Sequence, residues 1–138
     1  MKSVLVGGCF DILHLGHVKF LKKAKSFGDY LIVLLEPDAN IKKLKGSTRP
    51  LQNERQRKEI LFSLNFVDKV ILVPNNATGE TYNKIVKKLK PSVIATTQGD
   101  PIKHIKLLQA KSVGAKLKVI KMYKSLSTTK ITQLLEIE

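Results

Sequence analysis

The sequence predicts an α/β fold in which a doubly wound, five-stranded parallel sheet lies between two layers of helices. Three observations lead to this prediction. Short apolar stretches of strand length alternate along the chain with longer stretches of helical periodicity. The helical stretches separate successive strands, as the crossover connection of a parallel pair requires. Polar clusters follow several of the strands, where such a sheet places its binding loops.

The strands are predicted from apolar content. The first stretch is β-branched and apolar, and the second is apolar almost throughout, so both indicate buried strands. We expect the five strands at Ser3–Val6, Tyr30–Leu35, Lys69–Val73, Ser92–Thr96 and Lys116–Lys121.

The helix boundaries are marked by capping and breaking residues. Asn53 is a favoured residue before a helix, and Pro91 is typical of a position just beyond one. Pro101 suits a first helical turn, and Gly114 suits the position that follows a helix. The expected helices are Leu15–Lys25 (with Leu15, Val18, Leu21 and Ala24 on one face), Ala39–Leu44, 53 to about 64, Thr81–Leu89, 101 to about 113, and a terminal helix that opens at Ser127.

These elements combine into a Rossmann-like, three-layer α/β/α arrangement with right-handed crossovers. The chain has 138 residues and 43% hydrophobic residues, which are enough for one ordinary core. It contains no linker, repeat or low-complexity tract. We therefore expect a single domain over residues 1–138.

Composition narrows the classes of partner. The net charge of +14 would attract phosphorylated substrates and also nucleic acid. Aromatic residues make up only 6% and do not alternate with the basic residues as a base-stacking surface requires, so we do not expect a nucleic-acid partner. No apolar segment is long enough to span a membrane, and the single cysteine suits a reducing compartment. We expect a soluble, cytoplasmic protein.

The most informative segment follows the first strand. Gly7 and Gly8 allow backbone N–H groups to approach a ligand, and a helix begins a few residues later. Such a strand, glycine turn and helix N-terminus form an anion site. His14 and His17 flank the start of the helix and can donate to a phosphate. A zinc site would need more ligands, because Cys9 is the only thiol.

Other polar clusters are expected at the same edge of the sheet. Gln98-Gly99-Asp100 follows the fourth strand, and Ser127-Thr128-Thr129-Lys130 follows the fifth. The segment that contains Lys45, Arg49 and Arg57 follows the second strand. Ligands of such sheets bind outside the carboxyl ends of the strands, so these clusters should converge on one site.

Two of these segments resemble known signatures. The segment Gly8-Cys9-Phe10-Asp11-Ile12-Leu13-His14-Leu15-Gly16-His17 resembles the HxGH motif of the cytidylyltransferase-like nucleotidyltransferases. The segment Ser127-Thr128-Thr129-Lys130-Ile131 resembles the second signature of that superfamily. Together with Leu44–Pro50 and Gln56-Arg57, the first segment is most similar to the heptose 1-phosphate adenylyltransferase domain of lipopolysaccharide core synthesis. Glycerol-3-phosphate cytidylyltransferase comes next.

The resemblance implies transfer of a nucleoside monophosphate, AMP from ATP, onto a phosphorylated small molecule such as a sugar 1-phosphate, with release of pyrophosphate. It implies Mg²⁺ as cofactor and a homodimer, and it does not identify a metal ligand. The catalytic residues implied are His14 and His17 on the triphosphate, Lys45 between acceptor and α-phosphate, and Arg57, with Arg55 as its neighbour, near the triphosphate. The nucleotide-binding residues implied are Gly8, Cys9, Phe10, Asp11, Gly16, Gly99, Asp100, Ser127, Thr128 and Thr129.

Structural roles compete with several of these assignments. Asp11 can cap a turn, Phe10 suits the core, and Cys9 suits packing better than nucleophilic attack. For Lys45 the functional and the solvated interpretations are about equal, because Lys42 and Lys43 are close rivals. His104 has no partner in the sequence pattern and is expected at the surface.

The chain departs from the family pattern at four positions. These are Ser125 in place of a glycine, Met122 in place of an arginine, Pro101 in place of an aromatic residue, and Arg55 in place of a glutamate. The departures affect the acceptor and base pockets more than the triphosphate site. Alternatives therefore stay open: a cytidylyltransferase acting on glycerol 3-phosphate, an FMN adenylyltransferase, or a non-catalytic module that binds nucleotides or nucleic acid.

Overall fold

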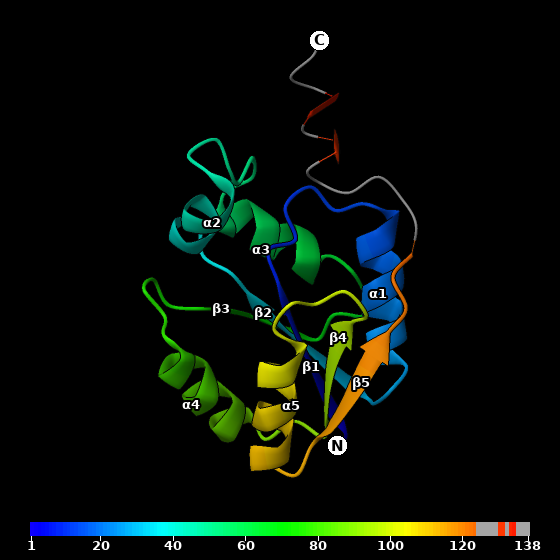
Figure 1. Ribbon diagram of the computed structural model, residues 1–138. Coiled ribbons are helices and arrows are strands. Elements are labelled where there is room, and N and C mark those ends of the chain that lie inside the picture. Colours follow the sequence, from blue (N-terminus) through cyan, green and yellow to red (C-terminus); the bar gives the residue numbers. More distant parts are fainter. Residues whose placement is uncertain (124–129, 132, 135–138) are drawn as a thin grey trace.

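The computed structural model describes residues 1–123, 130, 131, 133 and 134. Within this part, five parallel strands form one sheet flanked by helices (Figure 1). The strands are β1 (Ser3–Gly8), β2 (Tyr30–Leu35), β3 (Lys69–Leu72), β4 (Val93–Thr97) and β5 (Lys116–Ile120). The helices are α1 (Leu15–Lys25), α2 (Asp38–Lys45), α3 (Glu54–Phe62), α4 (Gly79–Leu89) and α5 (Lys103–Ser112). The predicted fold class is confirmed.

The strand order is β3-β2-β1-β4-β5, and every pair is parallel. The chain extends the sheet to one side of β1 and then returns to extend it on the other side. The point where the order reverses therefore lies between β1 and β4. Open α/β sheets bind their ligands at the carboxyl ends of the strands at this point.

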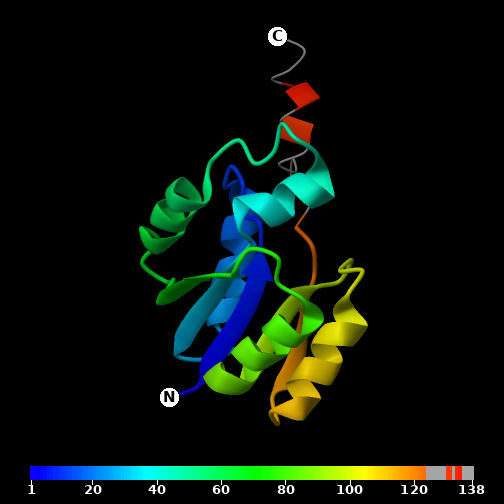
Figure 2. The same ribbon diagram turned by 90° about the vertical axis from the view of Figure 1, so that its left-hand side faces the viewer.

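Alternating side chains of the strands divide the core into two layers. Val4, Val6 and Val33 pack on the face that holds Leu21 of α1 and Leu61 of α3. Leu5, Ile32 and Ile94 pack on the opposite face with Val86 of α4 and Ala110 of α5. Figure 2 shows the two helical layers on either side of the sheet. Because both faces are covered, the strands are apolar almost throughout.

Capping residues account for the helix starts, and they correct two predicted boundaries. Asn53 caps α3 as predicted, since its side chain accepts a hydrogen bond from the backbone N–H of Gln56 at 2.9 Å. Helix α4 starts at Gly79 rather than Thr81, because Thr78 is its N-cap residue. Helix α5 starts at Lys103, two residues after Pro101.

Other sequence expectations concern exposure and the end of the chain. Leu15 was expected on the buried face of α1 but is 53% exposed, because it lies in the first turn at the edge of the sheet. The predicted opening of a terminal helix at Ser127 falls outside the described residues. Within the described part of the chain, no helix has both the length and the apolar character to span a membrane.

The fully buried side chain of Arg57 joins the ends of β1 and β2 to α2. Its Nη1 donates to the backbone carbonyls of Cys9 and Glu36 at 2.8 and 2.7 Å. Its Nε donates to the carbonyl of Gln52 at 3.0 Å, and its Nη2 donates to Asp38 Oδ1 at 2.8 Å. One guanidinium thus satisfies four oxygens that a smaller side chain would leave unpaired.

We predict that Arg57→Met lowers the free energy of unfolding by about 3–5 kcal/mol, because the Asp38 carboxylate and three carbonyls lose a buried donor. Urea denaturation measures the change. Arg55→Met is the matched control, since Arg55 is exposed on the same helix and should change stability by less than about 0.5 kcal/mol. Equal stabilities of the two variants would contradict the structural role of Arg57.

Candidate active site

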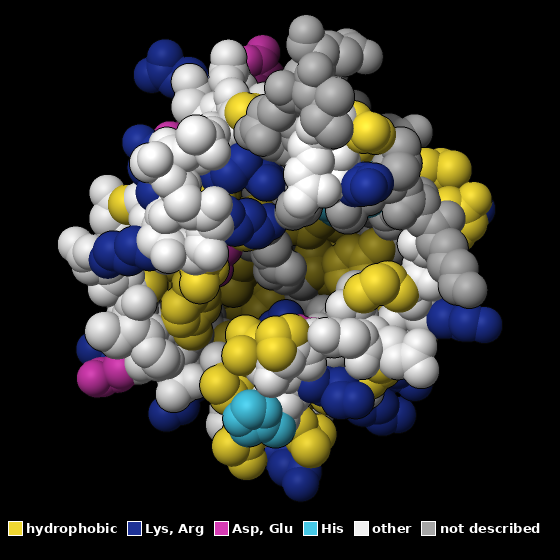
Figure 3. Space-filling view, turned by 45° about the horizontal axis from the view of Figure 1, so that its top comes forward, with side chains coloured by type: hydrophobic (Ala, Val, Ile, Leu, Met, Phe, Trp, Pro, Cys, Tyr) yellow, Lys and Arg dark blue, Asp and Glu magenta, His cyan; other side chains and the backbone are white. Residues whose placement is uncertain are grey.

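A cavity of about 990 Å³ opens beside α1 at the carboxyl end of the sheet. Figure 3 shows this edge as a hollow with an apolar floor and with lysine and arginine side chains along part of its rim. The cavity brings together most of the site residues that the sequence predicted: Gly8, Cys9, Phe10, Asp11, His14, Gly16, His17, Lys45, Gly99 and Asp100. Segments far apart in the sequence therefore meet at the edge where the strand order predicts a ligand.

The two histidines cap α1 and also line the cavity. His14 Nδ1 accepts a hydrogen bond from the backbone N–H of Gly16 at 3.1 Å. His17 Nδ1 accepts one from the backbone N–H of His14 at 3.2 Å. The Gly16 amide, predicted to bind nucleotide, therefore already has a partner within the helix cap. Because both Nδ1 atoms are acceptors, each neutral imidazole carries its proton on Nε2.

Electrostatics keep both imidazoles neutral at pH 7. Burial lowers the pKa of His14. Burial, followed by the adjacent His14 and by Lys45, lowers the pKa of His17 to about 4. The ring centroids of the two histidines are 3.9 Å apart, so protonation of one ring disfavours protonation of the other. The pair therefore supplies neutral N–H donors to the cavity.

A strained turn connects β1 to α1. Phe10 and Ile12 have φ values of 48° and 52°, which residues with side chains rarely adopt. Between them, Asp11 is 1% exposed. Its Oδ2 accepts from Arg49 Nε at 3.1 Å, and its two oxygens accept from the backbone N–H groups of residues 51–52 at 2.8 and 3.0 Å. These bonds hold the turn in place.

The structure corrects the predicted position of Arg57, whereas Asp11 lies at the cavity as predicted. Asp11 lines the cavity, and its carboxylate accepts hydrogen bonds from Arg49 and from the backbone of residues 51–52, so it holds the turn. Arg57 does not line the cavity, and its buried guanidinium is used by protein oxygens. It supports the site from beneath because it holds the Cys9 carbonyl. The family resemblance placed Arg57 near the triphosphate, and the fold buries it beneath the turn instead.

The competing structural roles of Cys9 and Phe10 agree with their environments. Burial raises the pKa of the Cys9 thiol, despite the opposing charge of Lys45, so the thiol is not activated for attack. Phe10 is 6% exposed and belongs to the core beneath the turn. A Cβ atom on Gly8 would lie 2.9 Å from the Phe10 ring, so only glycine fits beside it.

The three lysines of α2 differ in position. Lys45 lines the cavity and contributes to the lowered pKa of His17. Lys43 lies in the wall of a second cavity, where its Nζ donates to Asn76 Oδ1 at 3.1 Å. Lys42 lines neither cavity. The position at the end of the helix thus separates Lys45 from its two rivals.

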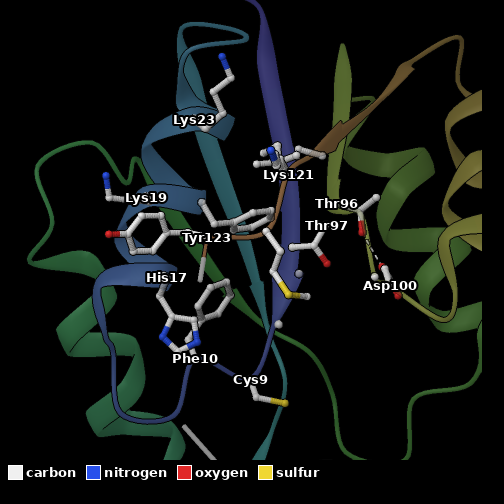
Figure 4. Close-up of a pocket in the computed structure, with 18 of the residues that line it drawn as sticks. Cys9, Phe10, His17, Lys19, Lys23, Thr96, Thr97, Asp100, Lys121 and Tyr123 are labelled. Atoms are coloured by element: carbon white, nitrogen blue, oxygen red, sulfur yellow. Dashed lines mark hydrogen bonds between the residues drawn. The ribbon is translucent and has the colours of Figure 1, made fainter. Parts of the chain in front are cut away.

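A second polar cluster faces the histidines across the cavity, as Figure 4 shows for Asp100, Thr96 and His17. Asp100 Oδ2 accepts hydrogen bonds from Thr96 Oγ1 and from Lys106 Nζ, each at 2.5 Å. Although burial opposes the shift, these bonds lower the pKa of Asp100, so it is a carboxylate at neutral pH. Gly99 lies next to it, with Met122 over its Cα.

Residues 5–134 match the cytidylyltransferase-like family. The chain belongs to this family. The predicted nucleotidyltransferase class is thereby confirmed, as is the superfamily resemblance of the histidine motif. Ser127, Thr128 and Thr129, which carry the second signature of this cytidylyltransferase-like protein, lie outside the described residues.

Curated relatives agree with this assignment. The chain is 40% identical over 128 residues to the bifunctional protein HldE of Aliarcobacter butzleri, with 93% of this chain and 25% of the relative covered. It is 39% identical over 132 residues to HldE of Campylobacter jejuni subsp. doylei, with 96% and 27% covered. This cytidylyltransferase-like chain thus spans about a quarter of the length of the relatives it matches.

A solved structure supports both the fold and the family. The lipopolysaccharide core biosynthesis protein of Thermoplasma volcanium superposes with a TM-score of 0.71 at 29% sequence identity. The match covers 91% of this chain and 98% of that one. The shared fold thus extends over nearly all of both chains.

Sequence analysis missed several residues that line the cavity. Thr96 and Lys106 are held by Asp100, and Tyr123 follows β5. The Nζ of Lys19 lies 4.5 Å from the centroid of the Tyr123 ring, a cation–π contact that orients the ring beside the cavity. In the sequence, Lys19 and Lys106 have the spacing of ordinary surface lysines, so no local signal marked them.

The second cavity, of about 660 Å³, lies on the other side of the β1 end. It is bordered by α2, α4 and α5, and sequence analysis did not predict it. Four residues line both cavities, namely Gly7, Gly8, Ala95 and Lys106. Because three of these four are small, the two cavities approach each other closely at the carboxyl ends of β1 and β4.

The pKa of His17 makes stability depend on pH. In the unfolded chain this ring takes up a proton near pH 6.5, and in the folded chain only near pH 4, so the free energy of unfolding should fall as pH drops through this range. Between pH 7 and 5, the free energy of unfolding of His17→Gln should fall by about 1 kcal/mol less than that of the parent chain, after allowance for solvent screening. Urea denaturation at both pH values measures it.

His104→Gln is the control, because His104 is exposed on α5 and lines neither cavity. This variant should keep the pH dependence of the parent chain. If His17→Gln also kept the pH dependence of the parent chain, the conclusion that folding lowers the pKa of His17 would be contradicted.

Proposed function

We propose that this chain transfers AMP from ATP to a sugar 1-phosphate of the heptose type and releases pyrophosphate. The observation that carries the proposal is a pair of cavities that meet at Gly7 and Gly8. The first cavity is lined by the two histidines that cap α1, and the second is not. A transferase with two substrates needs two adjoining sites, so that the acceptor can reach the α-phosphate.

In this proposal the histidine-lined cavity binds the nucleoside triphosphate. The phosphates lie along the backbone of Gly8, Cys9 and Phe10 toward the N-terminus of α1, where the helix dipole favours anions. His14 and His17 donate from Nε2 to the phosphates and to the leaving pyrophosphate. Neutral donors serve here because the transition state redistributes negative charge that positioned N–H groups can stabilise.

The nucleoside is assigned to the opposite wall. Gly99 and Asp100 line this wall, and Asp100 supplies a carboxylate there. Ser127, Thr128 and Thr129 are assigned to the β- and γ-phosphates on the family resemblance. The choice of adenine over cytosine rests on the similarity to the heptose 1-phosphate adenylyltransferase domain.

The second cavity is assigned to the acceptor. An oxygen of the acceptor phosphate attacks the α-phosphorus in line, the bond from that phosphorus to the bridging oxygen breaks, and pyrophosphate leaves. No protein nucleophile takes part, which agrees with the raised pKa of Cys9. Lys45 is proposed to neutralise charge between the acceptor phosphate and the α-phosphate.

Mg²⁺ is proposed to arrive with the triphosphate. The described part of the chain holds no group of three or more His, Cys, Asp or Glu side chains suited to a metal ion. This donor set fits an ion held mainly by phosphate oxygens and water, as Mg²⁺ prefers. When bound, the ion would neutralise phosphate charge, and the protein would position the phosphates around it.

The acceptor class follows from the relatives. The Thermoplasma volcanium structure is that of a lipopolysaccharide core biosynthesis protein, and the resemblance of residues 8–17 is to the heptose 1-phosphate enzyme domain. A sugar phosphate also suits the polar side chains of the second cavity. We propose a homodimer on the same resemblance.

Pyrophosphate release tests the proposal. Purified chain with Mg²⁺ is given ATP or CTP together with heptose 1-phosphate, glycerol 3-phosphate or FMN. We expect the highest kcat/KM with ATP and heptose 1-phosphate. Release only with CTP and glycerol 3-phosphate, or only with FMN, would replace the proposed substrates. Absence of release with every pair would overturn the enzyme assignment.

The same assay tests the histidine pair. We expect His17→Ala to lower kcat by about 10²- to 10³-fold, the loss typical of removing one donor to a developing charge. His104→Ala should retain the parent rate, because this exposed imidazole lies outside both cavities. An unchanged rate in His17→Ala would exclude the residue from the mechanism.

Two neighbouring lysines offer a further comparison. We expect Lys45→Ala to lower kcat/KM for the acceptor by about 10- to 100-fold, since a charge-assisted hydrogen bond to phosphate is lost. Lys42→Ala removes the same charge three residues earlier on α2, outside both cavities, and should have little effect. Equal effects of the two substitutions would show that only the general positive field matters.

A further inference from the structure

The wall of the second cavity carries a carboxylate that the phosphate chemistry does not explain. Glu36 follows the last residue of β2 and lines this cavity together with Asn40 and Tyr82. The Tyr82 hydroxyl lies 2.7 Å from Glu36 Oε1 and 2.9 Å from Oε2, and Asn40 Nδ2 donates to Oε2 at 3.0 Å. Glu36 follows β2, whereas Asn40 belongs to α2 and Tyr82 to α4, so the tertiary fold assembles the three side chains.

This network is rich in hydrogen-bond acceptors. The phenol donates its proton to the carboxylate, so its oxygen keeps lone pairs that can accept. Each carboxylate oxygen also accepts more than one hydrogen bond. Burial, together with the hydrogen bond to Glu36, raises the pKa of Tyr82, so the hydroxyl stays protonated.

The charge of the network restricts what can lie against it. A carboxylate repels a phosphate group, so the phosphate of an acceptor is disfavoured next to Glu36. The cavity also reaches Gly7, Gly8 and the Lys106 side chain of α5, where it adjoins the histidine-lined cavity, and the backbone N–H of Glu36 donates to the Gly8 carbonyl at 3.0 Å. An acceptor bound with its phosphate toward the Lys106 ammonium presents its remaining groups to the Glu36 side chain. Groups that donate hydrogen bonds, such as adjacent hydroxyls, fit there.

We propose that Glu36, held by Tyr82 and Asn40, determines acceptor specificity by accepting hydrogen bonds from the hydroxyl groups of a sugar phosphate. This inference rests on the proposed function and deepens it, because it assigns the polyol end of the substrate to named side chains. A site built to bind a hydroxyl rejects the analogue that lacks it, since the polar groups of the site are then left unpaired.

The test compares acceptors and variants in the pyrophosphate assay. Heptose 1-phosphate and its monodeoxy analogues are measured with the parent chain, Glu36→Gln and Tyr82→Phe. We expect one or more deoxy analogues to lose about 10- to 100-fold in kcat/KM with the parent chain. With Glu36→Gln, kcat/KM for heptose 1-phosphate should fall by a similar factor. Its kcat/KM for the deoxy analogue should be little lower than that, because the interaction with the missing hydroxyl is already lost. The KM for ATP should not change.

Matched controls separate specificity from stability. Glu80→Gln removes a carboxylate that is 78% exposed on α4 and lies outside both cavities, and Tyr30→Phe removes a hydroxyl at the start of β2, also outside them. Both controls should keep the acceptor preference of the parent chain. Thermal unfolding identifies any variant whose loss comes from reduced stability, which would lower activity with all acceptors alike.

Each outcome decides the proposal. If the parent chain, Glu36→Gln and Tyr82→Phe discriminate equally among the deoxy analogues, the role of Glu36 is overturned. The proposed function is then left intact. Turnover only of acceptors without a sugar overturns the proposed acceptor, and this inference with it. Loss of discrimination confined to the two network variants supports the proposal.

Discussion

The buried guanidinium of Arg57 is the interaction on which both cavities depend. It bonds to the carbonyl of Cys9, in the turn that leads to the histidines, and to the carbonyl of Glu36, whose side chain lies in the other cavity. The ends of parallel strands expose carbonyl groups that no neighbouring strand satisfies, and burial without a donor would be costly. The planar guanidinium has several fixed donors and therefore satisfies the carbonyls at the ends of both strands.

The histidine pair shows how one local structure serves two purposes. A helix N-terminus leaves backbone N–H groups without intrahelical partners, and the two Nδ1 atoms satisfy two of them. The same bonds orient the rings and place their protons on Nε2. Stability of α1 and preparation of the site are therefore not separate properties. Burial and mutual proximity then keep the rings neutral, so they act as N–H donors rather than as fixed charges.

Consecutive residues make up most of the site that was predicted from sequence, and Lys45, Gly99 and Asp100 were added because their segments follow other strands. Strand β1, its glycines and the histidines of α1 are contiguous, so hydrophobic patterning and spacing reveal them. Asp11 and Arg57 were assigned to the nucleotide site on the family resemblance. Asp11 bonds to the Leu51 amide 40 residues away, and Arg57 bonds to the Cys9 carbonyl 48 residues away, so the local pattern does not reveal these contacts. The pairing of Tyr82 with Glu36, at a separation of 46 residues, left no mark in the local pattern.

The amino-acid sequence by itself determined the α/β class, the capped start of α3 and the phosphate-type turn after β1, because periodicity, capping and glycine placement act over a few residues. The tertiary structure alone decided which charged groups are buried and which face a cavity. It also created the second cavity, since β2, α2 and α4 supply its polar wall from separate parts of the chain. Burial and pairing depend on neighbours brought together by the strand order, and that information is not local.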